Sequence, residues 1–237
     1  MKNLKIFRNS RVIVTGHTGF KGSWLTAWLK QLGADVMGIS LDPPSYPSHF
    51  VVSKINLGIK DVRLDIRDKK KLEKKFIAFK PHFVFHLAAQ PLVGLSYKKP
   101  MLTWQTNVFG TLNILEALRK FRNACNVVII TSDKCYFNKE VHYGYKETDV
   151  LGGKDPYSGS KASAEVLVSS YVNSFFSQKN QKIRIATARA GNVIGGGDWA
   201  KDRIIPDCVR SWSKNKKAEL RNPNATRPWQ HVLEAVG

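Results

Sequence analysis

The fold is predicted by one stretch near the start of the chain, Arg11-Val-Ile-Val-Thr-Gly-His-Thr-Gly-Phe-Lys-Gly22. A short apolar run, typical of a buried strand, leads directly into a loop with a glycine at every third position. Glycine permits positive φ and close backbone approach. A helix that begins after such a loop offers free N–H groups and its positive dipole end to a pyrophosphate. The stretch therefore predicts strand, dinucleotide-binding loop and helix. The expected cofactor-binding residues are Gly16, His17, Thr18, Gly19, Phe20 and Gly22.

Strand and helix patterns alternate along the chain up to residue 190. The expected strands cover residues 11–15, 35–40, 62–64, 83–87, 127–131 and 183–188. The expected helices cover residues 23–32, 69–79, 100–121 and 156–177. Strands that alternate with helices form a parallel sheet with helices on both faces. We therefore predict an α/β fold in which residues 1–190 form a Rossmann-type, doubly wound domain.

Residues 191–237 differ in composition from the rest. Glycine, proline and tryptophan become frequent there, which indicates a smaller C-terminal lobe that faces the substrate. Residues 229–237 are expected to form a helix that is cut short.

Composition limits the classes of protein to which the chain can belong. The 237 residues carry a net charge of +20, and 43% of them are hydrophobic. The basic residues are spread out, and clusters such as 69–75 are typical of solvated helix faces, so a nucleic-acid partner is not expected. No apolar run is long enough for a membrane span, and no secretory signal is expected. Cys125, Cys135 and Cys208 are widely spaced, which favours reduced thiols in the cytoplasm and no metal site.

Two acids follow strands at the edge where a dinucleotide would lie. Asp42 lies 20 residues beyond Gly22 and is expected to bind the adenosine ribose, which favours NAD over NADP; alternatively it only begins the turn before Pro43. Asp65 is expected to reach the adenine together with the Ile66 backbone, or else to cap the helix that follows.

Small and amide residues continue this edge. Leu87, Ala88 and Ala89 follow a strand, and their size would let the backbone approach the cofactor. Asn107 interrupts an amphipathic helix. If it is buried, its amide needs partners and would order the active-site end of that helix; the alternative is an exposed asparagine.

The strongest chemical signal is Tyr157-x-x-x-Lys161. Residues four apart share a helix face, so the ammonium can lie beside the phenol. A phenol has a pKa near 10, and a nearby cation favours the phenolate, which can accept a hydroxyl proton. Ser132 and Asp133 end an apolar strand and are expected to lie nearby. Together these residues indicate oxidation of an alcohol by a nicotinamide, with additional acid–base chemistry.

These motifs together resemble the extended short-chain dehydrogenase/reductase superfamily: Thr15-Gly-x-x-Gly-x-x-Gly22, His86-Leu-Ala-Ala89, Ser132 and Tyr157-x-x-x-Lys161. Within it the chain resembles the CDP-glucose 4,6-dehydratases. The strings that carry this resemblance are Gly16-His-Thr-Gly-Phe-Lys-Gly-Ser-Trp24, Leu41-Asp-Pro-Pro44, Thr131-Ser-Asp-Lys-Cys-Tyr136, Arg189-Ala-Gly-Asn-Val-Ile-Gly-Gly-Gly-Asp-Trp199 and Arg227-Pro-Trp-Gln-His231.

The resemblance implies a hydro-lyase with tightly held NAD that converts CDP-D-glucose to CDP-4-keto-6-deoxy-D-glucose, a deoxysugar precursor for lipopolysaccharide. Tyr157 would be the base at the C4 hydroxyl, and Lys161 would lower its pKa and hold the nicotinamide ribose. Ser132 would bind the C4 oxygen, Asp133 would be the acid at O6, and Lys134 the base at C5. Lysine is a base only when neutral, a state that burial and neighbouring cations favour. The alternative for Asp133 and Lys134 is a surface ion pair.

The resemblance also implies substrate contacts and an assembly. The expected substrate-binding residues are Gln90, Asn192, Arg203, Arg227 and His231; Val193 adjoins Asn192 in the same segment. Arginine suits a pyrophosphate, whereas His231 has an alternative place on a helix face. Trp199 and Trp229 are expected in the core rather than stacked on a base. A homodimer or higher homo-oligomer is expected through the helices at 100–121 and 156–177.

Three hypotheses remain open from the sequence, and the CDP-glucose 4,6-dehydratase described above is the first. Other enzymes of this superfamily, such as nucleotide-sugar epimerases, share most of the motifs. A non-enzymatic nucleotide-binding or nucleic-acid-binding module is the third possibility. Family members continue well past this length, so part of the substrate lobe is expected to be absent, and the nucleobase follows from the resemblance alone.

Overall fold

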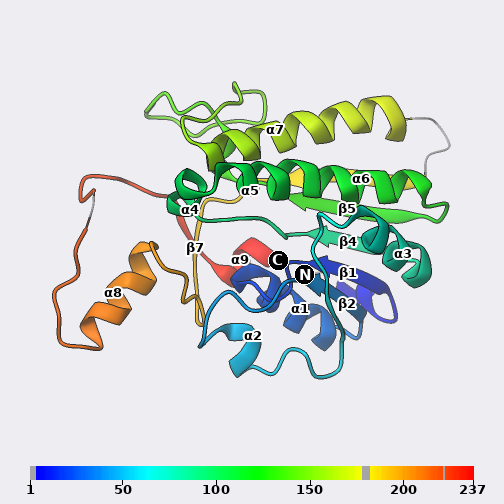
Figure 1. The fold of residues 1–237 in the computed structure, drawn as a ribbon, viewed down its shortest axis with the longest axis horizontal. Helices are drawn as coiled ribbons and strands as arrows, with labels where there is room; N and C mark the ends of the chain where they lie inside the picture. Colours follow the sequence, from blue (N-terminus) through cyan, green and yellow to red (C-terminus); the bar gives the residue numbers. More distant parts are fainter. Residues whose placement is uncertain (1–3, 178–181, 221) are drawn as a thin grey trace.

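A computed structural model describes residues 4–177, 182–220 and 222–237. A six-stranded parallel sheet lies between two layers of helices (Figure 1), in the strand order β3-β2-β1-β4-β5-β6. The strands are β1 (Arg11–Thr15), β2 (Asp35–Ser40), β3 (Lys60–Arg63), β4 (Phe83–His86), β5 (Cys125–Ile130) and β6 (Ile183–Ala188). Strands β2 and β3 are added on one side of β1 and strands β4 to β6 on the other, which confirms the predicted doubly wound sheet.

Helices cover both faces of the sheet. One layer holds α3 (Lys69–Phe79), the continuous helix α5–η2–α6 (Pro100–Trp104, Gln105–Phe109, Gly110–Lys120) and α7 (Pro156–Tyr171), which continues as η4 (Val172–Phe176). The other layer holds α1 (Phe20–Gln31) and α9 (Val232–Val236). Short helices lie in the connections: η1 (Leu4–Phe7), α2 (His49–Val52), α4 (Val93–Lys98) and η3 (Asp133–Cys135). No helix in the described ranges is long and apolar enough to cross a membrane.

Two cores follow from the alternation of side chains along the strands. Ile13 points into the core beneath α3, α6 and α7, together with Phe76 and Leu118. Val12 and Val14 point to the opposite face and pack against Leu25 and Leu29 of α1. Strands buried on both faces in this way appear in the sequence as continuous apolar runs.

Most predicted boundaries match, and the differences have local causes. β1, β2, β6 and α3 have the predicted bounds, whereas α1 begins at Phe20 rather than 23 because Gly19 serves as its N-cap. β3 covers 60–63 rather than 62–64, since its pairing with β2 begins at Met37 and Lys60. The predicted helix at 100–121 contains a π-helical turn, η2, which a 3.6-residue period cannot reveal.

The prediction of a single helix at 229–237 was wrong. Trp229–His231 form β8, which pairs in parallel with β7 (Asn192–Ile194), and only the last residues form α9. The β8 ladder is the reason: Asn192 and Ile194 pair with Trp229 and His231, and helix begins only where this pairing ends. Val236 then packs beside the α1 core, so the end of the chain lies against the main domain.

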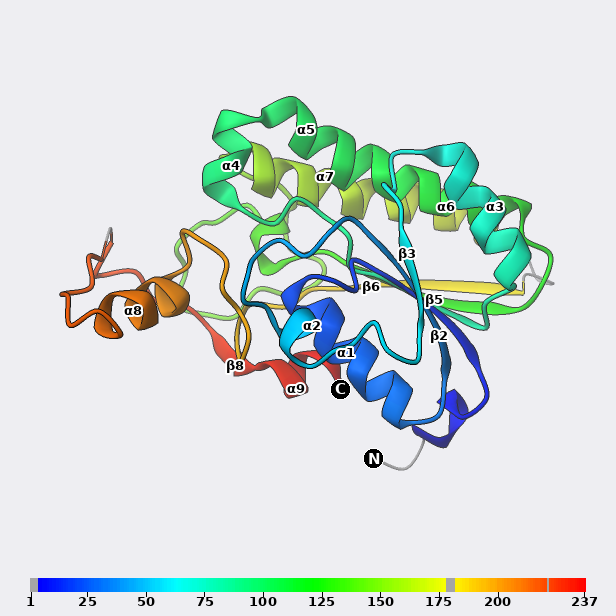
Figure 2. The same cartoon turned by 60° about the horizontal axis from the view of Figure 1, so that its bottom comes forward.

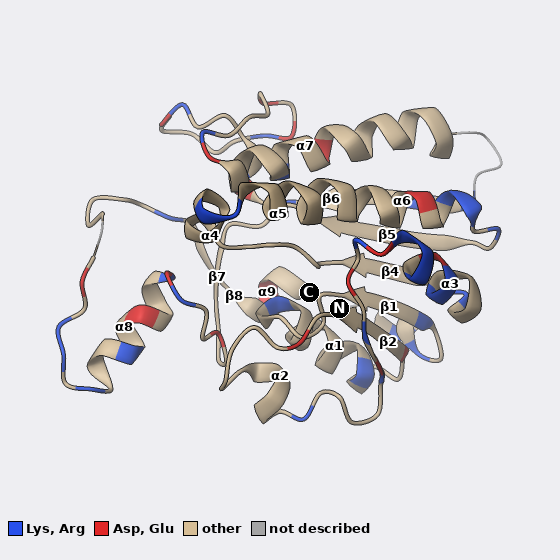
Figure 3. Cartoon of the chain, in the orientation of Figure 1, with Lys and Arg blue, Asp and Glu red and all other residues tan. Residues whose placement is uncertain are grey.

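The segment between β7 and β8 extends away from the sheet. It carries α8 (Ile204–Trp212), which lies to one side of the molecule in both ribbon views (Figure 2). Charged residues are distributed over several elements (Figure 3), and Lys69, Lys70, Lys71, Lys74 and Lys75 form an exposed face of α3, as predicted. Lys69 and Lys120 are paired with Glu116 and Glu73.

Candidate functional site

The glycine loop after β1 forms a cradle that side chains would fill. Gly16 has φ of +75°, and a Cβ there would lie 2.7 Å from the Ala88 amide nitrogen. A Cβ on Gly22 would lie 2.1 Å from the Gly16 carbonyl oxygen. Gly19 makes no side-chain cap, so the N–H groups that open α1 are free to bind an anion. The half-buried residues Leu87, Ala88 and Ala89 follow β4 beside this loop. The loop therefore fits a dinucleotide pyrophosphate.

His17 belongs to this loop, but its side chain points into the protein. The ring is fully buried, and its Nε2 lies 2.8 Å from Asp61 Oδ1. It packs over Gly38, where a Cβ would come within 2.3 Å of the ring, and against the edge of Phe50. Burial lowers the pKa of His17. Thr18 likewise bonds inward to Ser40 and Leu41. The side chains support the loop, so a cofactor contact from these two residues would come from the backbone.

The two predicted acids have different surroundings. Asp42 follows β2, with a side chain that is 89% exposed and 3.6 Å from Arg63 Nε, so its carboxylate is accessible to a ribose. Asp65 forms a 2.6 Å ion pair with Arg67, and hydrogen bonds from Arg67 hold the pKa of Asp65 below its usual value. The alternative that Asp65 caps the next helix was wrong, because Asp68 is the N-cap of α3. Ile66 is buried against Gly110.

Asn107 is buried, as its predicted ordering role requires. Its Oδ1 accepts from the Gln90 amide at 2.8 Å, and its Nδ2 donates to the Gln90 carbonyl and to Ser160 Oγ at 2.9 Å. Ser160 Oγ donates to the Tyr157 carbonyl at 2.7 Å. The amide therefore links the loop after β4 to the first turn of α7. Gln90 itself is buried, and its side chain bonds to Leu92 and Thr103.

Tyr157 and Lys161 lie on the first two turns of α7, which begins where predicted. Asp155 caps the helix and accepts from the Tyr157 and Ser158 amides. Burial raises the pKa of Tyr157, while a hydrogen bond with Ser132 and the charge of Arg203 act to lower it. Lys161 Nζ donates to the Ile130 carbonyl at 3.2 Å. The expected lowering of the Tyr157 pKa is therefore not found in the protein alone, because desolvation outweighs the groups that favour the phenolate.

The turn that follows β5 carries Ser132, Asp133 and Lys134. Ser132 is the N-cap of η3: its Oγ accepts from the Lys134 amide at 3.2 Å and donates to Asp133 Oδ1 at 3.0 Å. The Asp133 amide donates to the Ala190 carbonyl, which ties the turn to the end of β6. Asp133 and Lys134 are half-buried, and within the described ranges they form no ion pair with each other. The surface ion pair considered from the sequence is thus not what the structure contains.

The sequence analysis did not identify one buried carboxylate beside the site. Glu165 is 5% exposed on α7, one turn beyond Lys161. It accepts hydrogen bonds from Thr131, from Thr187 and from both Nε and Nη2 of Arg189, each of these last two at 2.9 Å. An acid on the buried face of a predicted helix was the available signal. Arg189 therefore has a structural role, since its guanidinium is held in this buried ion pair.

The C-terminal candidates separate into two groups. Arg203 lies at the start of α8, is bonded to Asp198 at 2.9 Å and influences the pKa of Tyr157, so it belongs to the surroundings of Tyr157. Asn192 is half-buried in β7. Arg227 is exposed and bonds to the Thr226 carbonyl, and His231 caps α9. Trp229 is 42% exposed, so its predicted core packing was wrong, because it lies on the small β7–β8 ladder.

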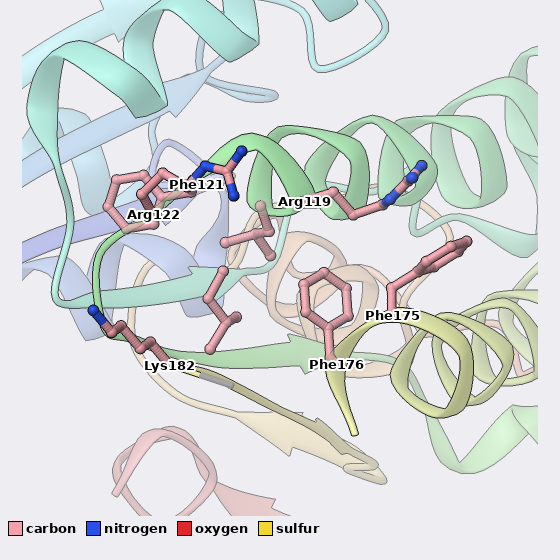
Figure 4. Close-up of a pocket in the computed structure, with 8 residues that line it drawn as sticks. Arg119, Phe121, Arg122, Phe175, Phe176 and Lys182 are labelled. Carbon is pink, nitrogen blue, oxygen red and sulfur yellow. The ribbon is translucent and has the colours of Figure 1, made fainter. Parts of the chain in front are cut away.

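A surface hollow of about 360 Å³ lies elsewhere (Figure 4). It is lined by the end of α6, by η4 and by the start of β6, including Arg119, Phe175 and Phe176. Since the candidate residues Ser132, Asp133 and Lys134 follow the carboxyl end of β5, the hollow lies at the opposite end of the parallel strands. No cluster of three metal-binding side chains occurs among the described residues.

Comparison with known proteins gives consistent results. The family model for GDP-mannose 4,6-dehydratase matches residues 13–237. The CDP-glucose 4,6-dehydratase of Salmonella typhimurium is 52% identical over all of this chain, which spans 67% of that protein. An epimerase from Methanothermobacter thermautotrophicus superposes with a TM-score of 0.86 at 25% identity, over 100% of this chain and 68% of its own. The Thermus thermophilus UDP-glucose 4-epimerase, solved with NAD, superposes with a TM-score of 0.80 at 26% identity, over 95% and 72%.

Lys161 makes the stability of the protein depend on pH. Burial, and then the charge of Lys21, lower its pKa to about 8, from about 10.4 in an unfolded chain. The folded state therefore holds this proton less tightly, so a folding penalty is present below pH 8 and disappears as the pH rises toward about 10.4. We expect Lys161→Met to be more stable than the wild type at pH 7 by about 1–3 kcal/mol, after the lost hydrogen bond is allowed for.

Urea unfolding at pH 7 and at pH 10 measures this difference. The advantage of the variant should shrink at pH 10, whereas Lys154→Met, at an exposed lysine, should match the wild type at both. A Lys161→Met protein less stable than the wild type at pH 7 would contradict the expectation.

Proposed function

This chain belongs to the GDP-mannose 4,6-dehydratase family of the extended short-chain dehydrogenase/reductase superfamily, and we propose that it catalyses the NAD-dependent dehydration of CDP-D-glucose to CDP-4-keto-6-deoxy-D-glucose. The Salmonella relative supports the choice of CDP-glucose. The glycine cradle, the free N-terminus of α1 and the exposed Asp42 carboxylate support NAD as the cofactor. The nucleotide sugar is anionic, which suits a protein with a net charge of +20.

A single juxtaposition carries the proposal. The turn with Ser132, Asp133 and Lys134 lies against the start of α7. There a hydrogen bond with Ser132 lowers the pKa of Tyr157, and the charge of the Asp133 carboxylate raises it. An alcohol dehydrogenase needs only the phenol and the serine. A carboxyl group and an amine on the same turn add a second acid–base couple, which elimination of water requires.

Each residue of the site has a separate role in the proposed reaction. When bound, NAD accepts a hydride from hexose C4 and later returns it to C6. Tyr157 Oη accepts the O4 proton, while Ser132 Oγ orients that oxygen. Lys134 Nζ would then remove the C5 proton, which the C4 ketone makes acidic, while Asp133 donates a proton to O6 so that water leaves. The Lys134 ammonium would return a proton to C5 when C6 receives the hydride. Lys161 holds the nicotinamide ribose. Because the hydride is returned, the net reaction is a hydro-lyase reaction.

The division of the chain and the remaining contacts are part of the proposal. Residues 1–190 would bind the cofactor and residues 191–237 would contact the substrate. Arg203, which lies in the catalytic region, is the best-supported ligand for the sugar-nucleotide diphosphate. Three buried, unpaired cysteines support a reducing compartment such as the cytoplasm.

A nucleotide-sugar epimerase is the second candidate, supported by the fold of the solved epimerases. The two activities differ in their products. We expect incubation with NAD and CDP-glucose to yield a sugar nucleotide that mass spectrometry shows to be lighter by one water. This product should absorb in base as a 4-keto-6-deoxy sugar does. UDP-, dTDP- and GDP-sugars in parallel test the nucleobase. An isomer of unchanged mass would instead identify an epimerase.

Lys134→Ala tests the assignment of the C5 base. The variant should lose exchange of the C5 hydrogen with deuterated water, because its base is gone, but should still form NADH by oxidation at C4. Loss of C5 exchange is expected to reach about 100-fold. Lys139→Ala, at an exposed lysine in the following loop, is the matched control. Full C5 exchange in Lys134→Ala would remove Lys134 from this role.

We further propose that the chain forms a homodimer through α5, η2 and α7. These helices pack side by side: Asn107 bonds to Ser160, and Trp104 lies next to Gly159. Their outer face carries exposed apolar side chains, namely Met101, Trp104, Phe109 and Val166, which are 36–69% exposed. Large apolar side chains that are exposed together on neighbouring helices are typical of a subunit interface.

Charge on this face should dissociate the dimer. We expect Met101→Asp combined with Val166→Asp to sediment as a monomer at concentrations where the wild type is a dimer, because each carboxylate would lose its hydration on association. Tyr46→Asp, at a 77% exposed residue of another surface, should leave the dimer intact. A wild-type monomer would contradict the proposal.

A further inference from the structure

Lys21 is a half-buried cation in the glycine loop that the mechanism above does not use. It is the second residue of α1, directly after Phe20, and so lies on the helix turn that would face the cofactor pyrophosphate. Its neighbours on this turn pack against the C-terminal segment: Trp24 Nε1 donates to the Gly196 carbonyl at 3.0 Å, and the Phe20 ring lies beside Gly195. The turn is therefore fixed in place.

Four charged groups from three parts of the chain interact electrostatically with the Lys21 ammonium. Asp133 comes from the turn after β5, Lys161 from α7, and the bonded pair of Asp198 and Arg203 from the segment that leads into α8. Asp133, Lys161 and Arg203 are the groups that also define the catalytic region. The side chain of Lys21 thus links the cofactor cradle to the catalytic residues.

A charged ammonium at this position loses part of its hydration, which costs free energy. Burial lowers the pKa of Lys21, and the charge of Arg203 lowers it further, whereas Asp133 and Asp198 act in the opposite direction. The same charge helps to lower the pKa of Lys161. An apolar side chain would pack on the same turn, as Phe20 and Trp24 do, without this cost. The cation is therefore better explained by an electrostatic effect on what binds here than by packing.

The place of the nicotinamide follows from the proposed reaction. It would have to reach from the glycine cradle at the start of α1, where Lys21 stands, to the hexose carbon that faces Tyr157. The oxidised nicotinamide is positively charged and the reduced one is neutral, so a nearby cation repels only the oxidised form. We propose that Lys21 disfavours the oxidised cofactor relative to the reduced one and thereby promotes removal of the C4 hydride. The inference rests on the proposed function.

The ratio of the dissociation constants of NAD⁺ and NADH tests this role without turnover. We expect Lys21→Met to lower Kd(NAD⁺)/Kd(NADH) by roughly tenfold, the size of a unit charge acting over a short, partly solvated distance. Lys21→Arg keeps the charge and should keep the wild-type ratio. Lys30→Met changes an exposed lysine at the other end of α1 and is the matched control. Titration calorimetry gives both constants, and circular dichroism verifies folding.

The outcomes separate the two proposals. If both forms bind and Lys21→Met leaves the ratio unchanged, the role of Lys21 is overturned while NAD binding stands. The role of Lys21 is likewise overturned if Lys21→Arg or Lys30→Met shifts the ratio as much as Lys21→Met does, or if Lys21→Met weakens only CDP-glucose binding, since Lys21 would then be a substrate ligand. If the wild type binds neither NAD⁺ nor NADH, the proposed function fails, and the inference fails with it.

Discussion

The arrangement of the site depends on the hydrogen bonds and the ion pair that the Glu165 carboxylate accepts. It stands on α7, one turn from Lys161, and bonds to Thr131 at the end of β5 and to Thr187 and Arg189 at the end of β6. Thr131 directly precedes Ser132. A buried ion pair gains little stability over apolar packing, but loss of one partner leaves an unpaired charge at high cost. The pair therefore fixes the register between α7 and the turn that carries Asp133 and Lys134.

The site is built from groups that the protein holds at some cost in stability. Tyr157 and Lys161 are almost fully buried, and burial opposes the charged form of each. Hydrogen bonds compensate only in part, as with the bond from Lys161 to the Ile130 carbonyl. Groups that are poised in this way respond strongly to a neighbouring charge, because a low-dielectric surrounding does not screen it. A bound cofactor is such a charge.

Much of the fold could be predicted, because buried parallel strands and amphipathic helices leave strong periodic signals. The bounds of β1, β2, β6 and α3 were correct, and Asn107 has the partners that its burial requires. Short elements were missed where tertiary contacts decide: β7 and β8 exist only because each pairs with the other. The motifs pointed to the turn that carries Ser132, Asp133 and Lys134, but Glu165 and Lys21 were missed. A single charged residue leaves no periodic pattern in the sequence, and the groups around these two come from distant segments. The inward orientation of His17 depends on the absence of a side chain at Gly38, another residue remote in sequence.

The β7–β8 pairing has an evolutionary consequence. It anchors both ends of the excursion that carries Arg203 and α8, while the sheet and the glycine cradle are completed by other residues. Insertions or deletions between these two anchors would change how far the excursion reaches without altering the sheet or the glycine cradle. The length and sequence of this one segment can therefore diverge between lineages while the main domain keeps its fold.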